Sequence, residues 1–131
     1  MEFARSYESL AAVFDMIALF LRHEGIDAAL GFDLDLIAEE LFTNMVKYGN
    51  GAGPVDITIT RDGDHVALVF RDEGTQPFDV TRPRPLPTDV PLAERRPGGL
   101  GLGLVQRMAD GFDYRHDGRT GTTTVRKRIV R

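Results

Sequence analysis

The sequence predicts an α+β fold: a two-layer α/β sandwich in which helices cover one face of a mixed, mostly antiparallel sheet. Apolar residues first recur every three or four positions over residues 6–48, which is the period of helices. They then alternate with polar residues over residues 55–60, which is the period of strands. With the elements that follow, the order is αα, ββ, loop, α, ββ, in a single domain over residues 1–131.

Two helices are expected in the first third of the chain. Ser6 is a candidate cap for the first helix, and Gly25 is a suitable residue to end it. The second helix runs from about Asp27 or Asp33 to Tyr48. The apolar stripe of the first is Leu10, Val13, Phe14, Ile17 and Leu21, and that of the second is Leu30, Leu34, Ile37, Leu41 and Met45.

Two strands joined by a tight turn come next. Residues 55–60 alternate between apolar and polar, so one face of this strand is buried. Asp62-Gly63 is a hairpin turn signal. Residues 66–70 are apolar on both faces, which is typical of a central strand.

A long loop separates these strands from the rest of the domain. Residues 75–97 show no apolar period and contain six of the seven prolines. A loop of this length inside a compact domain is more often functional than accidental. A helix is expected at residues 98–108, followed by strands at 112–116 and 122–129 with a turn at 117–121.

Composition excludes several classes of protein. Net charge is −4 and pI is about 5.3, which argues against sequence-independent binding to nucleic acid. There are no cysteines, so disulfides and thiolate metal sites are excluded. No apolar run approaches the ~20 residues that span a membrane, and the N-terminus lacks a signal-peptide core. We therefore expect a cytoplasmic protein.

The second helix carries a polar pair beside its apolar stripe. Glu40 and Asn44 are four residues apart, so they lie on one side of the helix at the edge of the buried face. A carboxylate there can accept a proton, and an amide oxygen is a hard ligand that suits Mg²⁺. The alternative is that both are solvated surface residues.

Two further features are candidates for ligand binding. The glycine run from Gly98 to Gly103 opens a helix, where free N–H groups and the helix dipole favour an anion. Asp72 follows the central strand and can accept a hydrogen bond from an amino group. The alternatives are a flexible loop that caps a helix for the glycines and a turn-forming residue for Asp72.

The order of these features resembles the GHKL (Bergerat) ATP-binding fold shared by gyrase, MutL and histidine kinases. It is more similar to the stand-alone anti-sigma factor serine/threonine kinases of the RsbW and SpoIIAB type. Residues 40–44 (Glu-Leu-Phe-Thr-Asn) match the N box, residues 72–79 (Asp-Glu-Gly-Thr-Gln-Pro-Phe-Asp) the first glycine box, and residues 98–103 (Gly-Gly-Leu-Gly-Leu-Gly) the second. The resemblance covers nearly the whole chain.

The resemblance implies ATP and Mg²⁺ as cofactors and a role for each matched residue. Glu40 would be the general base and Asn44 the Mg²⁺ ligand. Asp72 would bind the adenine amino group, and residues 75–97 would form the ATP lid. The remaining implied nucleotide-binding residues are Gly74, which lets the base pack closely, Gly99, Gly101 and Gly103 at the phosphates, and Thr122, which would support Asp72 through a water.

Two departures from the anti-sigma kinases concern the end of the second helix and its base. Tyr48 stands where those kinases usually carry a histidine, and Lys47-Tyr48 is similar to histidine kinases, in which the lysine reaches a phosphate. Histidine kinases, however, generally have an asparagine at the position of Glu40. A carboxylate is what a kinase acting on a hydroxyl needs, because serine loses its proton as it attacks.

Three functions follow as hypotheses. The first is an ATP-dependent serine/threonine kinase and anti-sigma factor, whose partners are a small STAS-type antagonist, a sigma factor or both. The second is a nucleotide-gated binding module without kinase activity, and the third is the catalytic domain of a histidine kinase. None involves direct contact with nucleic acid or membrane, and all allow a homodimer.

Overall fold

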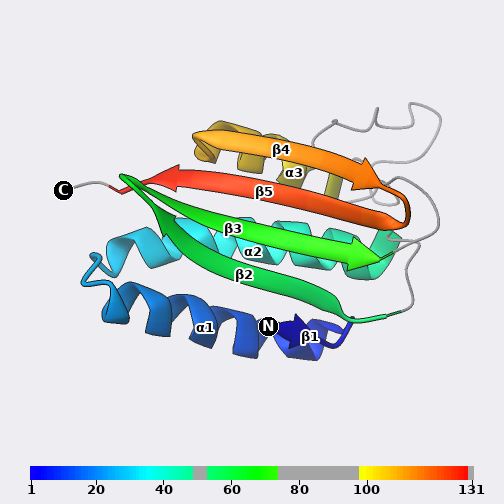
Figure 1. Ribbon diagram of the computed structural model, residues 1–131, viewed down its shortest axis with the longest axis horizontal. Helices are drawn as coiled ribbons and strands as arrows, with labels where there is room; N and C mark the ends of the chain where they lie inside the picture. The colour runs from blue at the N-terminus through cyan, green and yellow to red at the C-terminus, as the bar shows by residue number, and fades with distance from the viewer. Residues whose placement is uncertain (49–52, 74–97, 130–131) are drawn as a thin grey trace.

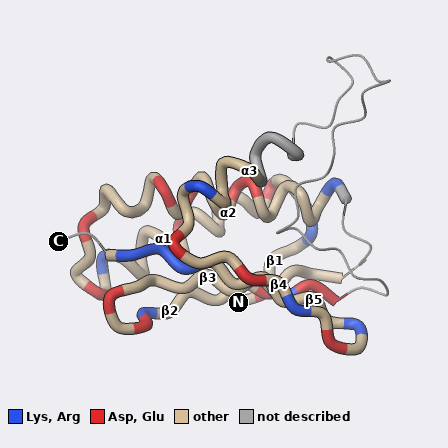
Figure 2. The backbone as a smooth tube through the Cα atoms, turned by 90° about the horizontal axis from the view of Figure 1, so that it is seen from above, with Lys and Arg blue, Asp and Glu red and all other residues tan. Residues whose placement is uncertain are grey.

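The protein folds into two layers, a five-stranded sheet and a layer of helices on one of its faces (Figure 1). The computed structural model describes residues 1–48, 53–73 and 98–129, with the backbone alone for residues 48 and 98–102. The predicted α+β class is confirmed. The layers are seen from a second side in Figure 2, where acidic and basic residues are interspersed along the chain.

The first helical segment begins with a short 3-10 turn, η1 (Tyr7–Ser9), and continues as α1 (Leu10–His23). The predicted cap at Ser6 is confirmed, since its hydroxyl accepts a hydrogen bond from the Glu8 N–H at 3.3 Å. Gly25 follows the helix with a φ of +67°, a conformation that glycine adopts without strain. The buried side chains of α1 are Val13, Ile17 and Leu21, all from the predicted stripe.

The second helix, α2 (Ala29–Tyr48), is the long helix that runs behind the sheet (Figure 1). Of the two expected starts, the structure has the earlier one. The Asp27 carboxylate accepts a hydrogen bond from the Ala29 N–H at 2.9 Å, which caps the first turn. The predicted apolar stripe of five residues is buried throughout its length.

The sheet has the strand order β1-β2-β3-β5-β4, and each of these pairings is antiparallel. The strands are β1 (Glu2–Phe3), β2 (Val55–Asp62), β3 (His65–Glu73), β4 (Gly111–Asp117) and β5 (Thr120–Arg128). β3 is central, as predicted. β1 has no counterpart in the sequence analysis, because two residues carry no period.

Two-residue turns join the hairpins. The chain reverses between Asp62 and His65, with Gly63 at a φ of +60°. The second hairpin reverses between Asp117 and Thr120, with Gly118 at the same φ. The predicted turn at residues 117–121 was therefore too long, because both flanking strands extend further into it.

Alternation along the strands sends one set of side chains into the core. Val66, Leu68 and Phe70 of β3 are fully buried against the helices. Arg71 and Glu73 are exposed on the other, open face of the sheet, where Ala67 and Val69 also lie. α3 (Gly98–Met108) completes the helical layer beside α2 (Figure 1), at the predicted position.

The predicted loop at residues 75–97 and the glycine Gly74 lie outside the described residues. In the part of the chain that the structure covers, no helix is long and apolar enough to cross a membrane.

The packing of α2 on the sheet predicts which changes unfold the protein. Ile37→Ala removes a fully buried side chain, so we expect the free energy of unfolding to fall by about 2–5 kcal/mol. Leu19→Ala, at a position of α1 that is 59% exposed, should change it by less than about 0.5 kcal/mol. Denaturant unfolding of both variants tests this, and equal losses would contradict the assignment of the core.

Candidate functional site

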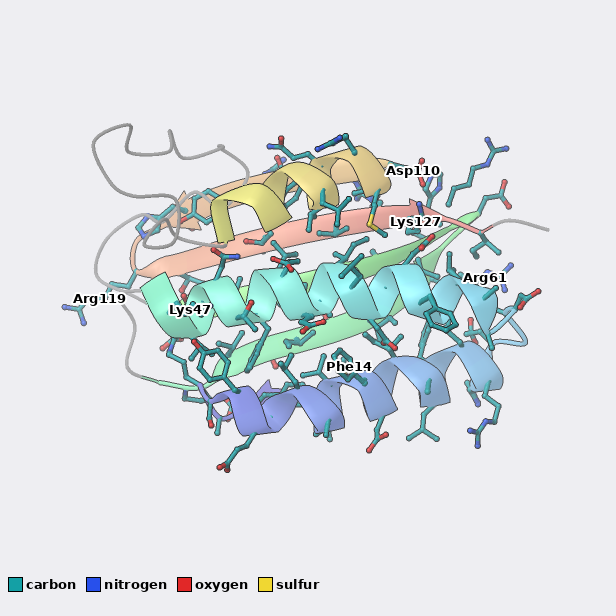
Figure 3. All side chains as sticks on the ribbon, turned by 180° about the vertical axis from the view of Figure 1, so that it is seen from behind. Phe14, Lys47, Arg61, Asp110, Arg119 and Lys127 are labelled. Carbon is teal, nitrogen blue, oxygen red and sulfur yellow. The ribbon has the colours of Figure 1, made fainter. Side chains whose placement is uncertain are left out.

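Four chain segments meet at one end of the molecule. The pairing of Asp72 with Gly121 brings the last residues of β3 beside the first residues of β5. Figure 3 places Lys47, in the last turn of α2, at the same end as Arg119 of the β4–β5 turn. α3 also begins at this end, because its last residues are held at the other one. The sequence positions matched to the N box and to both glycine boxes therefore converge here.

The opposite end of the helical layer is fixed by Lys127. Its ammonium group donates a hydrogen bond to the Met108 carbonyl at 2.6 Å, at the last residue of α3. The same group lies 3.6 Å from the Asp33 carboxylate near the start of α2. These contacts orient α2 and α3 in the same direction, with Lys127 and Asp110 far from Lys47 (Figure 3).

Asn44 is buried and its amide is oriented by its own helix. The side chain is 3% exposed, and its Nδ2 donates a hydrogen bond to the backbone carbonyl of Glu40 at 2.6 Å. Because the nitrogen is used in this way, the amide oxygen is the atom directed away from that carbonyl. The alternative of a solvated surface residue does not hold for Asn44.

Glu40 is half-buried one helical turn before Asn44. Burial, which removes water from the carboxylate, is the main cause that raises its pKa. The neighbouring charge of Glu39 raises the pKa further, whereas Lys47 lowers it. A carboxyl group whose pKa moves toward neutrality is a better proton acceptor in a cleft than one at its ordinary value.

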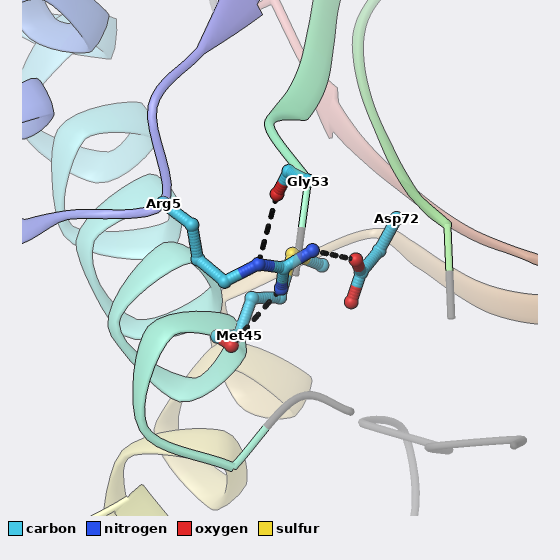
Figure 4. Close-up of polar contacts among 4 residues, drawn as sticks. All are labelled: Arg5, Met45, Gly53 and Asp72. Carbon is cyan, nitrogen blue, oxygen red and sulfur yellow. Dashed lines mark hydrogen bonds and ion pairs between the residues drawn. The ribbon is translucent and has the colours of Figure 1, made fainter. Parts of the chain in front are cut away.

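Asp72 lies on the helix-facing side of β3, in line with Phe70 and Leu68. Its carboxylate forms an ion pair with Arg5, and the two side chains are only 14% and 10% exposed. Figure 4 shows the guanidinium of Arg5 between Asp72 and the backbone of Met45 and Gly53. The carboxylate is thus held by a residue that sequence reasoning did not find.

Thr122 is not placed where its predicted role requires. It pairs with Arg71 and lines the open face of the sheet with Arg71 and Arg115, on the side away from Asp72. Thr123 is 1% exposed and shares the helix-facing side with Asp72 and Gly121. The support of Asp72 by the Thr122 side chain is therefore wrong, because strand residues alternate between faces.

The parity of β5 could have corrected this assignment. Val125 and Ile129 are apolar and mark the odd-numbered positions as the core-facing ones, so Thr123 was the better candidate. No local signal pointed to Arg5. Its contacts join it to residues 40 to 67 positions away in the chain.

The glycines of the site play different structural roles. A Cβ at Gly103 would meet no atom within 4 Å, so the protein itself does not require a glycine there. At Gly121, a Cβ would approach the Tyr114 hydroxyl to 3.1 Å, so Tyr114 packs over this position only because it lacks a side chain. Gly99 and Gly101 lie in the first turn of α3, where backbone N–H groups are free of helix partners.

The donor set fits a magnesium nucleotide better than a metal held by protein alone. Within residues 1–48, 53–73 and 98–129, no group of three or more histidine, aspartate or glutamate side chains is placed to hold a metal ion. Mg²⁺ bound to a triphosphate needs only one or two protein oxygens. The oriented amide oxygen of Asn44 suffices for this.

Comparison with known proteins agrees with this geometry. Residues 3–127 match the family HATPase_c_2, described as the histidine kinase-like ATPase domain. The match covers nearly the whole chain, so the chain belongs to this family of the GHKL superfamily. Membership supports ATP binding and a kinase-type or ATPase activity in general terms. No curated protein matches the sequence.

Two solved structures share the fold. The histidine kinase AdeS of Acinetobacter baumannii is 16% identical with a TM-score of 0.52, and the match covers 77% of this chain and 48% of that one. The histidine kinase domain of the blue-light activated kinase EL346 of Erythrobacter litoralis is 16% identical with a TM-score of 0.50, covering 76% and 44%. The chain therefore spans about half the length of these structures.

The raised pKa of Glu40 predicts a pH-dependent effect on stability. A carboxyl group whose folded pKa exceeds its unfolded value stabilises the fold most at low pH and loses that contribution as pH rises through the folded pKa. Glu40→Gln does not ionise, so its melting temperature relative to the parent should be higher at pH 7 than at pH 4. Thermal unfolding at both pH values measures this.

Glu8→Gln is the matched control, because Glu8 is exposed in η1. Its difference from the parent should stay nearly constant between the two pH values. A Glu40→Gln difference that is equally flat would show that burial does not perturb this carboxyl group.

Proposed function

We propose that this chain is an ATP-dependent protein serine/threonine kinase that also sequesters a regulatory partner, in the manner of an anti-sigma factor. The observation that carries the proposal is the pair on α2: a half-buried carboxylate, Glu40, one helical turn before a buried amide, Asn44. The pair lies on the helix whose end meets β3 and α3, so both side chains can serve the same bound nucleotide.

Each described residue of the site would have a distinct task. Asn44 would hold Mg²⁺ through its amide oxygen, and Asp72 would accept a hydrogen bond from the adenine amino group. The N–H groups at the start of α3 would bind phosphate oxygens. Bound Mg·ATP would supply the γ-phosphoryl group and neutralise its charge.

Glu40 would act on the substrate hydroxyl. As the hydroxyl oxygen bonds to the γ-phosphorus and the bond to the β-phosphate oxygen breaks, the hydroxyl proton passes to the Glu40 carboxylate. ADP is then the leaving group. The perturbing neighbours of Glu40 support this task, since Lys47 limits the rise in pKa and keeps the carboxylate able to accept a proton at neutral pH.

The proposed partners follow from the motif resemblance. The protein substrate would be a small antagonist domain of the STAS type, and the sequestered partner would be a sigma factor. Residues 75–97 would close over the nucleotide as a lid, and Gly74 would border the base. A cytoplasmic location and an optional homodimer belong to the same proposal.

A second candidate is the ATP-binding part of a histidine kinase. The two similar solved structures, both histidine kinases, favour it at the level of fold. Lys47, which is exposed in the last turn of α2, is where those enzymes would reach a phosphate. The two chemistries can be separated, because a phosphate ester on serine survives acid whereas the P–N bond of phosphohistidine does not.

The decisive variants differ in what they remove. Glu40→Gln keeps shape and hydrogen bonding but loses the base, so Mg·ATP affinity should stay nearly constant while phosphoryl transfer falls by roughly 10²–10⁴-fold. Asn44→Ala removes the metal ligand, so it should weaken Mg·ATP binding itself. Calorimetry with Mg·ATP and transfer of labelled phosphate to a STAS-type antagonist measure the two effects.

Each outcome separates the candidates. An acid-stable product that depends on Glu40 supports the serine/threonine kinase, and an acid-labile product supports the histidine kinase. Transfer by Glu40→Gln at the parental rate would show that Glu40 is not the base. A parent that binds Mg·ATP and the antagonist but transfers no phosphate would be a nucleotide-gated binding module.

A further inference from the structure

Arg5 joins three segments that border the candidate site. Its Nη1 donates a hydrogen bond to the Met45 carbonyl in the last turns of α2 at 3.2 Å, and its Nε donates to the Gly53 carbonyl before β2 at 3.0 Å. Its Nη2 binds Oδ1 of Asp72 at the end of β3. The guanidinium is planar, so these three contacts fix its orientation (Figure 4).

The consequence for Asp72 is a fixed carboxylate. A side chain that is mostly buried and held through one oxygen by an arginine cannot turn freely about its own bonds. Because Oδ1 is bound to Arg5, a further donor would bind the second oxygen, which is turned away from the guanidinium in Figure 4. An ionised carboxylate offers only acceptor sites there.

We propose that Arg5 is a positioning residue that sets the purine selectivity of the site through Asp72. This inference rests on the proposed binding of ATP. By occupying Oδ1, Arg5 presents the second oxygen of Asp72 as a fixed acceptor for the 6-amino group of adenine. A 6-oxo purine offers an acceptor at this position, so it would face the carboxylate oxygen without a proton between them.

The chemistry makes selectivity a sensitive readout. A site built to hydrogen-bond a substrate group strongly rejects an analogue without that group, because its own polar atom is then left unpaired. If Arg5 is lost, the carboxylate is free to rotate or to take up a proton, and a protonated carboxyl can donate to a 6-oxo group. Discrimination then falls even where overall affinity is kept.

A purely structural role for Arg5 would have a different signature. ATP and inosine triphosphate carry the same ribose and triphosphate, so general damage at the end of α2 or β3 would weaken both equally. Their affinity ratio isolates the contact at the 6-position of the base. Stability is measured separately by thermal unfolding.

The experiment measures the dissociation constants of Mg·ATP and Mg·inosine triphosphate by calorimetry for the full chain. Arg5→Met keeps the length of the stem but removes all three hydrogen bonds, and we expect it to lower the preference for ATP by about tenfold or more. Arg5→Lys retains the charge but not the fork, so its preference should lie between those of the parent and Arg5→Met.

Arg115→Met is the matched control. Arg115 also pairs with an aspartate, Asp113, at 3.3 Å, but both are exposed on β4 and Arg115 belongs to the open face of the sheet. Its removal should leave the preference for ATP unchanged. This control separates the position of Arg5 from the loss of any arginine–aspartate pair.

The outcomes separate this inference from the proposed function. If the parent binds neither nucleotide, both fall. If the parent prefers ATP and Arg5→Met keeps the same preference, the inference falls and the proposed function stands; an equal affinity of the parent for both nucleotides also overturns the inference. If Arg5→Met does not fold, an unchanged preference in Arg5→Lys overturns it.

Discussion

The packing of one face of the sheet against α2 and α3 is the constraint on which the candidate site depends. Because strand side chains alternate between faces, this packing decides which residues of β3 and β5 can reach a ligand held beneath the helices. Phe70 and Leu68 fill the core, and the same parity carries Asp72 to the edge of that core at the end of the strand. Arg71 and Thr122, one position away, are directed to the open face instead.

The helical layer supplies the other half of the site. α2 and α3 are held in the same direction by Lys127, so the last turns of α2 and the first turn of α3 are found at one end. That end combines a buried amide, a half-buried carboxylate and free N–H groups at a helix start. Arg5 then ties the end of α2 to the end of β3, so the polar groups on the two layers keep a fixed separation.

Much of this arrangement was predictable, and the exceptions have physical causes. The spacing of Glu40 and Asn44 follows from the helical period, and the place of Asp72 follows from the end of an apolar strand. The role given to Thr122 was wrong because it came from a motif and not from the parity set by Val125 and Ile129. β1 has only two residues, and the contacts of Arg5 link distant segments, so neither leaves a periodic signal in the sequence.

The central claim is that Mg·ATP binds where α2 ends, β3 ends and α3 begins. Amide chemical shifts of the ¹⁵N-labelled protein, followed during titration with Mg²⁺ and a non-hydrolysable ATP analogue, test it most directly. The account predicts that the largest changes fall on Asn44, Asp72, Gly103 and Gly121, with little change at Asp33 and Lys127 at the other end. The largest changes on the open face, around Arg71 and Thr124, or no changes at all, would contradict it.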